Sequence, residues 1–439
     1  MKTLLALFVC VIASAATAEQ KQPNIIYFIG DGMGMEYVSA YRHYRDNPDT
    51  PAVETTWFDR HLVGTASTHP EDALQVTDSA ASATALAAGI KTYNGAIGVD
   101  GQKQPVETIL ERARTKGYQT AMVVTSQINH ATPASFAAHI DSRQKYDAIA
   151  DQYLDNRYQG KPWVDILFGG GQRYFLRDDR NLVQAFTELG YAYADNYDDV
   201  AAIKHLPALA LLADKGLPFA IDSKEPRRLS FLTQKALSLL GEEKPFFLLV
   251  EGSQIDWCGH ANDIACVMHE MHDAEKTLQA LEDYINSHPN TLLVATADHS
   301  TGGLSMGRDG DYAWRADVVQ GIKASANTLT DQLLSANDWY REWLALTAIE
   351  LSGDDRAALK QSIDRVAAGE TRADKNTAQT ELRGQLLAAI DKASVTGWTT
   401  SGHTGGDVGV WALGEGAQAF VGQQDNTQLA HQLFRLLGE

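Results

Sequence analysis

Three acidic residues stand directly after short apolar runs that have the length and composition of buried strands. The acids and their runs are Asp31 after Asn24–Gly30, Glu251 after Phe246–Val250 and Asp298 after Thr291–Ala297. In open α/β sheets, ligands bind outside the carboxyl ends of the strands, so we expect the three carboxylates to converge there. A lone Asp after a strand is more often a helix N-cap, so the inference depends on all three acids together.

Histidines accompany these acids in a pattern that suits a transition metal. His299 follows Asp298 directly, and His260 stands four residues after Asp256, on the same side of a helical turn. His403 lies in a loop of small residues, Ser401–Asp407. Mixed imidazole and carboxylate ligands favour zinc over calcium or magnesium.

A serine opens a run of small helix-forming residues, Val76–Gly89, where Asp78 and Ser79 come first. One interpretation is an N-capped helix that packs tightly on the sheet. The functional alternative makes Ser79 a nucleophile at a helix N-terminus, where backbone N–H groups and the helix dipole favour a phosphate. A serine hydroxyl needs a base or a metal to activate it. Since no G-x-S-x-G elbow surrounds Ser79, a metal is the better candidate.

Predicted strands and predicted helices alternate along the chain, and they must position these residues. The apolar runs that predict strands are Asn24–Ile29, Thr120–Thr125, Val164–Phe168, Phe246–Val250 and Thr291–Ala297. Helical periodicity appears between them, at Pro105–Thr115 and most clearly after Asn262. The alternation predicts an α/β fold, a three-layer α/β/α sandwich with a mostly parallel central sheet. The section from about 309 to 395 shows helical periodicity without a strand and predicts a helical insertion near the active site, or a continuation of the helical layer.

The first 18 residues have the features of a secretory signal peptide. Lys2 precedes the apolar stretch Leu4–Ile12, and Ala16–Ala18 provides an A-x-A cleavage site. We therefore expect cleavage after Ala18, a periplasmic or secreted location, and a catalytic domain over residues 19–439. No other apolar segment is long enough to span a membrane. The formal charge of −19 argues against nucleic acid or an anionic membrane as a partner.

Two cysteines remain after such a cleavage, Cys258 and Cys266, eight residues apart. On one continuous helix they would be separated by ~12 Å. A disulfide needs Cα atoms within ~7 Å. The spacing therefore predicts two free thiols.

Taken together, the motifs resemble those of the alkaline phosphatase family. They occur in the family's order: Asp31–Gly34, Thr77–Ala83, Lys91–Asn94, Ala131–Ala134, Glu251–His260, Ala297–His299 and His403–Gly405. The resemblance extends from about Asn24 to the C-terminus and is least secure over the helical insertion. It implies secreted hydrolysis of phosphate monoesters to alcohol and inorganic phosphate, through a phosphoserine at Ser79. It also implies a homodimer.

The resemblance implies ligands for two zinc ions and one magnesium ion per chain. The first zinc would take Asp256, His260 and His403; the second Asp31, Asp298 and His299, with Ser79 as a fourth contact; and the magnesium Asp31, Thr132 and Glu251. Arg143 matches the arginine that grips phosphate, which suits its planar fork of donors.

Two positions depart from the best-known bacterial pattern, which has Asp at His130 and Lys at Trp257. Marine bacterial family members carry these alternatives, and we expect both residues to lie beside the substrate.

A sulfatase is disfavoured because Ser79–Ala83 lacks the required Pro and Arg. A phosphodiesterase and a binding protein without turnover remain as alternatives.

Overall fold

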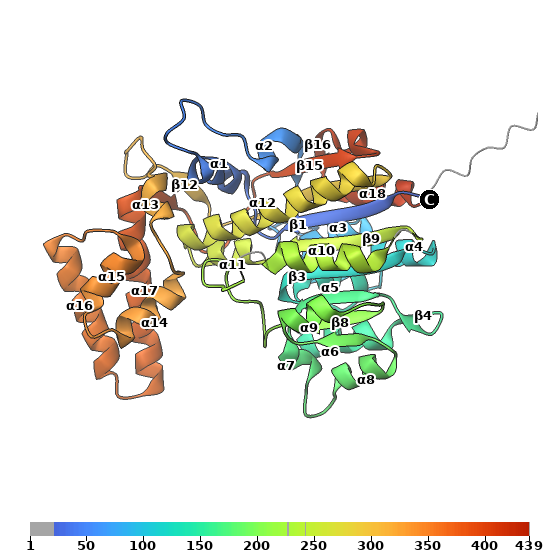
Figure 1. Cartoon of the computed structure of the whole chain (residues 1–439), viewed down its shortest axis with the longest axis horizontal. Helices are drawn as coiled ribbons and strands as arrows, with labels where there is room; N and C mark the ends of the chain where they lie inside the picture. Colours follow the sequence, from blue (N-terminus) through green and yellow to red (C-terminus); the bar gives the residue numbers. More distant parts are fainter. Residues whose placement is uncertain (1–21, 226–227, 242, 439) are drawn as a thin grey trace, which may run out of the picture.

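The computed structural model describes residues 22–225, 228–241 and 243–438. The predicted signal peptide lies outside the described residues. Within them, the core is a ten-stranded sheet (Figure 1). Its strands are, in spatial order, β16 (Gly422–Asp425), β2 (Leu62–Ser67), β15 (Val408–Gly414), β10 (Thr291–Ala297), β1 (Asn24–Gly30), β9 (Phe246–Gly252), β3 (Gln119–Gln127), β6 (Ile166–Gly170), β8 (Ala208–Leu211) and β7 (Ala192–Ala194). β15 is antiparallel to β10 and β2, and the other neighbours are parallel.

The five predicted strands are confirmed as β1, β3, β6, β9 and β10. Their apolar runs are buried on both faces, as strands in a parallel sheet covered by helices must be. The sequence did not reveal β2, β7, β8, β15 and β16. β7 has three residues and β16 has four partly polar ones, so neither carries a readable pattern.

Helices cover both faces of the sheet, which confirms the sandwich (Figure 1). One layer contains α1 (Met35–Arg45), α2 (Trp57–His61), α10 (Arg228–Leu240) and α12 (Ile264–Ser287). The other contains α3 (Ser79–Ala88), α4 (Ile109–Thr115), α5 (Ala131–Ala137) and α18 (Asn426–Leu436). α4 starts later than the periodicity predicted, because Thr108 and Glu111 form a capping box there.

Shorter elements connect this frame. They are α6 (Tyr146–Asp155), α7 (Gln172–Phe175), α8 (Leu182–Glu188), α9 (Tyr197–Ala202), α11 (Gln254–His260), β4 (Arg157–Tyr158), β5 (Lys161–Pro162), β11 (Ser300–Thr301), β14 (His403–Thr404) and a 3₁₀ turn at Ala417–Phe420. None of the helices in the described ranges has the length and apolar character needed to cross a membrane.

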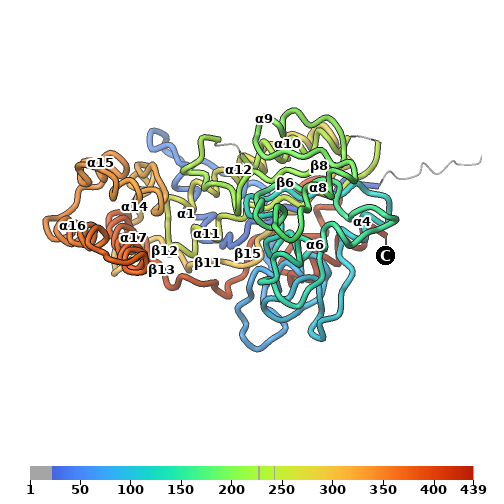
Figure 2. Tube along the Cα trace, turned by 90° about the horizontal axis from the view of Figure 1, so that it is seen from below, coloured from blue at the N-terminus to red at the C-terminus, as the bar shows by residue number. Residues whose placement is uncertain are grey.

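A purely helical segment extends from one end of the sheet, beside α11 (Figures 1 and 2). Its helices are α13 (Ala316–Gln320), α14 (Ala326–Ser335), α15 (Trp339–Thr347), α16 (Gly353–Ala368) and α17 (Arg372–Ser394). The antiparallel strands β12 (Leu304–Met306) and β13 (Thr396–Trp398) close its base. Leu333 and Trp343 could have supplied apolar interface surface by their sequence, but both are buried within their own chain. They are therefore unable to anchor a dimer.

The prediction of two free thiols is wrong, because Cys258 and Cys266 form a disulfide. The assumed continuous helix is broken between them. α11 ends at His260, Asn262 adopts a left-handed φ of 54°, and Asp263 caps the start of α12. This turn brings the two Cα atoms to 5.5 Å, within reach of a disulfide.

Candidate active site

The predicted acids meet at the carboxyl ends of the central strands. Gly30 pairs with Ala297 at the ends of β1 and β10, so Asp31 and Asp298 emerge side by side. Glu251 lies inside the end of β9, opposite Ile29. All three carboxylates are fully buried. The convergence expected from the sequence is confirmed.

Backbone constraints hold this edge in place. The N–H of Gly32 donates to Oδ1 of Asp298 at 3.0 Å. Gly32 has a φ of 71°, and a Cβ there would lie 2.7 Å from Cα of Asp256. Glycine is needed for both the left-handed conformation and the close approach. The acids of β1, β10 and α11 can therefore approach one another.

A first potential metal group consists of Asp256, His260 and His403. Pairing of β11 with β14 sets His403 opposite Thr301. Nδ1 of His260 lies 2.6 Å from the carbonyl of Ser401, and Nδ1 of His403 lies 2.8 Å from that of Thr77. A carbonyl only accepts, so each Nδ1 carries a proton, and the Nε2 atom of each ring is directed into the group.

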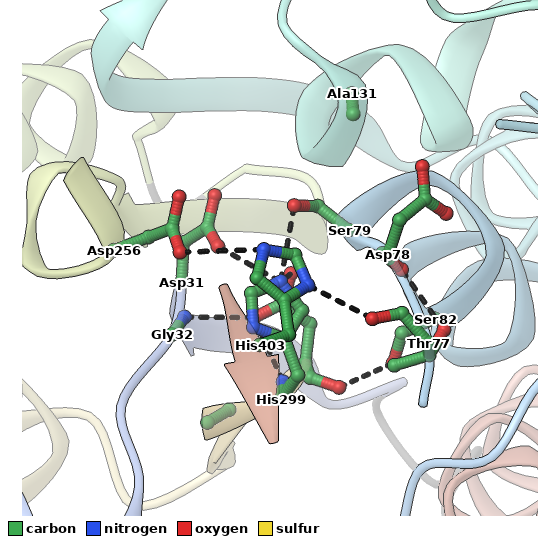
Figure 3. A network of polar contacts seen from close by, with 12 residues as sticks. Asp31, Gly32, Thr77, Asp78, Ser79, Ser82, Ala131, Asp256, His299 and His403 are labelled. Carbon is green, nitrogen blue, oxygen red and sulfur yellow. Dashed lines mark hydrogen bonds and ion pairs between the residues drawn. The ribbon is translucent and has the colours of Figure 1, made fainter. Parts of the chain in front are cut away.

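A second group forms around His299 (Figure 3). Asp31, Asp256 and His299 present atoms close enough to share one ion. Nε2 of His299 is 3.4 Å from Oδ1 of Asp31 and 3.3 Å from Oδ2 of Asp298. The structure thus brings together the expected Asp31, Asp298 and His299, and also places Asp256 between the first two groups.

A third group contains Asp31, Glu251 and His130. Thr132, the expected third ligand, lies in the first turn of α5, and its buried hydroxyl has no partner in the described structure. His130 had been expected beside the substrate. It lies 3.4 Å from a guanidinium nitrogen of Arg143 and within reach of the third group. Burial and the Arg143 charge lower the pKa of His130 to about 3, so the ring is neutral.

Buried negative charge at these groups favours a bound cation. Burial, with the charges of Asp298, Asp256 and Glu251, raises the pKa of Asp31 well above its usual value. Burial is also the main cause that raises the pKa of Asp298 to about 7 and that of Glu251 to about 8. Both carboxylate oxygens of Asp31 and of Glu251 are buried, and none of them has a hydrogen-bond partner among the described residues. Unpaired buried carboxylates are costly, and bound divalent cations would compensate them. The residues therefore fit metal ions.

Ser79 occupies the first position of α3, as predicted. Its Oγ lies 3.1 Å from Nε2 of His299, and the side chain is buried (Figure 3). Asp78 caps the helix by accepting from the N–H of Ala81 at 2.9 Å. The nucleophile candidate is thus held where the helix dipole favours an anion.

Arg143 reaches the same place from a loop. Its NH1 donates to Oδ2 of Asp78 at 3.0 Å, and its backbone N–H donates to Gly95. Trp257 stands across the site, with its ring centroid 5.7 Å from that of His130. A Cβ at Gly216 would lie 2.5 Å from the Trp257 ring, so the loop around Gly216 closes over the indole.

Comparison with known proteins agrees with this geometry. The family model described as "Alkaline phosphatase" matches residues 22–438. The chain belongs to the alkaline phosphatase family. It is 44% identical over 425 residues to "Alkaline phosphatase 3" of Bacillus subtilis (strain 168), covering 94% of this chain and 88% of that protein.

Two solved structures of alkaline phosphatases extend the comparison. A cold-active alkaline phosphatase from the psychrophile Shewanella sp. superposes with a TM-score of 0.88 at 44% identity, covering 95% of this chain and all of that one. A TAB5 alkaline phosphatase variant described as having "Mg bound in the M3 site" gives a TM-score of 0.68 at 25% identity, covering 95% and 98%. The chain is thus an alkaline phosphatase, a hydrolase of phosphate monoesters.

Sequence reasoning missed residues that support this alkaline phosphatase site. Asp78 was interpreted as a cap only, yet it also holds Arg143. Thr301 donates to Oδ1 of Asp256 at 2.5 Å and lies 3.2 Å from Nδ1 of His299. The position of Thr301, two residues after His299, was an available signal. The backbone carbonyls of Thr77 and Ser401, which orient His403 and His260, could not be recognised from the sequence, because every residue has a carbonyl.

Proposed function

We propose that this alkaline phosphatase works through a phosphoserine formed on Ser79, with two zinc ions and one magnesium ion per chain. The observation that carries the proposal is the contact of Ser79 Oγ with His299 Nε2, 3.1 Å, at a buried helix N-terminus. This contact supports the proposal because the Ser79 hydroxyl, a helix N-terminus that favours anions and the second metal group lie close together.

The ligand roles follow the three groups. Asp256, His260 and His403 would hold one zinc, and Asp31, Asp298 and His299, with Ser79, the other. Asp31, Thr132 and Glu251 would hold magnesium, with His130 adjacent. When bound, these cations supply Lewis-acid stabilisation of negative charge on the oxygens entering and leaving phosphorus. Magnesium is supported by the oxygen-rich donors Asp31, Thr132 and Glu251. The TAB5 variant with bound Mg carries an Asp in place of a His, whereas His130 remains beside the third group of this chain.

The protein's own groups orient the substrate. The Arg143 fork donates to two phosphate oxygens, and the positive end of the α3 dipole favours the same anion. The Ser79 hydroxyl gives its proton to solvent as Oγ attacks phosphorus, the bond from phosphorus to the alcohol oxygen breaks, and that oxygen takes up a proton from solvent as the alcohol leaves. Water then attacks phosphorus, the bond from phosphorus to Ser79 Oγ breaks, Oγ regains a proton, and inorganic phosphate is released. The neutral indole of Trp257 borders the phosphate site without adding charge.

Acid trapping tests this route. Enzyme quenched at low pH with p-nitrophenyl phosphate should carry phosphate on the peptide that contains Ser79. Ser79→Ala should lose several orders of magnitude in turnover while keeping its metal content. The bis-ester and the sulfate of p-nitrophenol should be much poorer substrates than the monoester. Near-normal turnover of Ser79→Ala would contradict the role.

We also propose export and dimerisation. The apolar stretch Leu4–Ile12 and the Ala16–Ala18 site support cleavage after Ala18, and N-terminal sequencing of the exported protein tests it. The partly exposed Leu334, Trp339 and Leu344 in the helical segment support a homodimer that involves this segment. Since β13 and His403 are close in the chain, the segment would also border the active-site entrance. Sedimentation of the intact enzyme should give twice the mass of one chain.

A further inference from the structure

A second cavity, of about 490 Å³, opens at the edge of the sheet opposite the active site. Its lining includes the first residues of β3, the residues just before β6 and β8, and Lys244 ahead of β9. These are the amino ends of the parallel strands, near α4 and β4 in Figure 1, whereas α11 and the metal groups lie at their carboxyl ends. The volume falls within the usual range for small-molecule sites.

One wall is a hairpin that the backbone holds in shape. β4 and β5 pair through a two-residue turn, Gln159 and Gly160, with φ values of 50° and 80°. Both left-handed values match a tight hairpin turn. The Tyr158 ring stacks on Trp163 with centroids 5.3 Å apart. The wall is therefore an ordered structure that presents Tyr158 and Lys161 to the cavity.

About half of the remaining lining is apolar or aromatic. These residues are Tyr118, Pro162, Leu189, Tyr191, Leu206 and Pro207. The Tyr191 hydroxyl donates to the carbonyl of Val164 at 2.6 Å, so this ring has a fixed orientation. Such a surface suits a flat apolar body.

The charge of the cavity is positive, in contrast to the chain as a whole. Arg114 and Asp165 lie 2.6 Å apart and compensate each other. Lys161 and Lys244 also line the cavity, and neither forms an ion pair within the described residues. Two uncompensated lysines in a chain of formal charge −19 mark this as a place for an anionic group.

We propose that this cavity is a second, non-catalytic binding site for a small aromatic anion. The aromatic body would lie among Tyr158, Leu189 and Pro207, and its carboxylate or other anionic group would face Lys161 and Lys244. The proposal is independent of the mechanism at Ser79, since the two sites lie at opposite ends of the strands.

Calorimetric titration of the metal-loaded enzyme with 2-naphthoate tests the site, with saturating inorganic phosphate to occupy the active site. We expect saturable binding of one naphthoate per chain, weaker at high salt because the lysines are exposed. Lys161→Ala/Lys244→Ala should weaken it about fivefold and Lys161→Glu/Lys244→Glu about tenfold or more. The neutral analogue 2-naphthylmethanol lacks the carboxylate, so its affinity for the unmodified enzyme should be low. It should not exceed the affinity of Lys161→Ala/Lys244→Ala for naphthoate.

A matched control removes two exposed lysines elsewhere, Lys204→Ala/Lys375→Ala, and should leave naphthoate binding unchanged. All four lysines are at the surface, so the variants should fold, and turnover of p-nitrophenyl phosphate reports this. Absence of saturable binding, equal affinity in the Ala pair, equal affinity for the alcohol, or displacement by phosphate would each overturn the proposal.

Discussion

The Nε2 atoms of His260 and His403 face each other at 3.1 Å. Each Nδ1 proton is directed to a backbone carbonyl, which leaves both Nε2 atoms directed toward each other. Oδ2 of Asp256 lies 3.4 Å from the same His260 nitrogen. Two imidazole nitrogens and a carboxylate oxygen that converge in this way form an arrangement that a bound cation stabilises.

Metal removal should therefore affect stability as well as activity. Chelator-treated enzyme should lose turnover and melt at a lower temperature, because the buried carboxylates lose their compensating charge. Zinc together with magnesium should restore both properties. Elemental analysis and calorimetric melting check this, with His403→Ala as the variant that should retain about one zinc fewer per chain. Full zinc content in His403→Ala would count against its role.

Arg143 should contribute to phosphate binding through its geometry and not only through its charge. Arg143→Ala removes two charge-assisted hydrogen bonds, so kcat/KM for p-nitrophenyl phosphate should fall about 100-fold. Arg143→Lys should recover only part of this, because a lysine lacks the planar fork. Inhibition by inorganic phosphate should weaken in the same order. The exposed Arg180→Ala is the control, and equal values for Lys and Arg at position 143 would argue against bidentate binding.

The Cys258–Cys266 disulfide should stabilise the part of the chain that carries Asp256 and His260. It closes a short loop, and its loss should cost about 2–3 kcal/mol of unfolding free energy. Both cysteines are buried, so Cys258→Ala/Cys266→Ala is a cleaner test than a reductant. Denaturant unfolding of the metal-loaded enzyme measures the cost, and zinc release to a chromogenic chelator should be faster in the variant. If the protein without substitutions shows two titratable thiols after unfolding without a reductant, the disulfide is absent.

The pair of His139 and Glu111 should make stability depend on pH. Nε2 of His139 lies 2.9 Å from Glu111, and Nδ1 lies 2.7 Å from the carbonyl of Gly98. Although burial opposes it, the Glu111 contact raises the pKa of His139 above its ordinary value of 6.5. The stabilisation is complete below the unfolded pKa, about 6.5, and is lost as pH rises through the higher folded value.

His139→Gln isolates this contribution, since a glutamine keeps polar contacts but does not titrate. The unfolding free energy of the native enzyme should exceed that of the variant by more at pH 5.5 than at pH 9. Denaturant titrations at the two pH values measure the difference. A gap that is constant or that grows with pH would contradict the assignment.

Features that depend on local pattern could be predicted from the amino-acid sequence. The apolar runs before Asp31, Glu251 and Asp298 predicted the central strands, and parallel strands end at one edge, so the convergence of these acids followed. The small-residue run after Asp78 placed Ser79 at a helix start. The ordered motifs together indicated the family.

Features that depend on chain reversal and on long-range contacts became visible in the folded structure. The turn at Asn262 made the disulfide possible, and no periodicity predicts a single left-handed residue. Asp78 also accepts a hydrogen bond from Arg143, and this contact joins residues that are 65 positions apart in the sequence. The burial of Trp343 in its own chain and the cavity at the amino ends of the strands likewise arise from packing between distant segments, which local sequence does not encode.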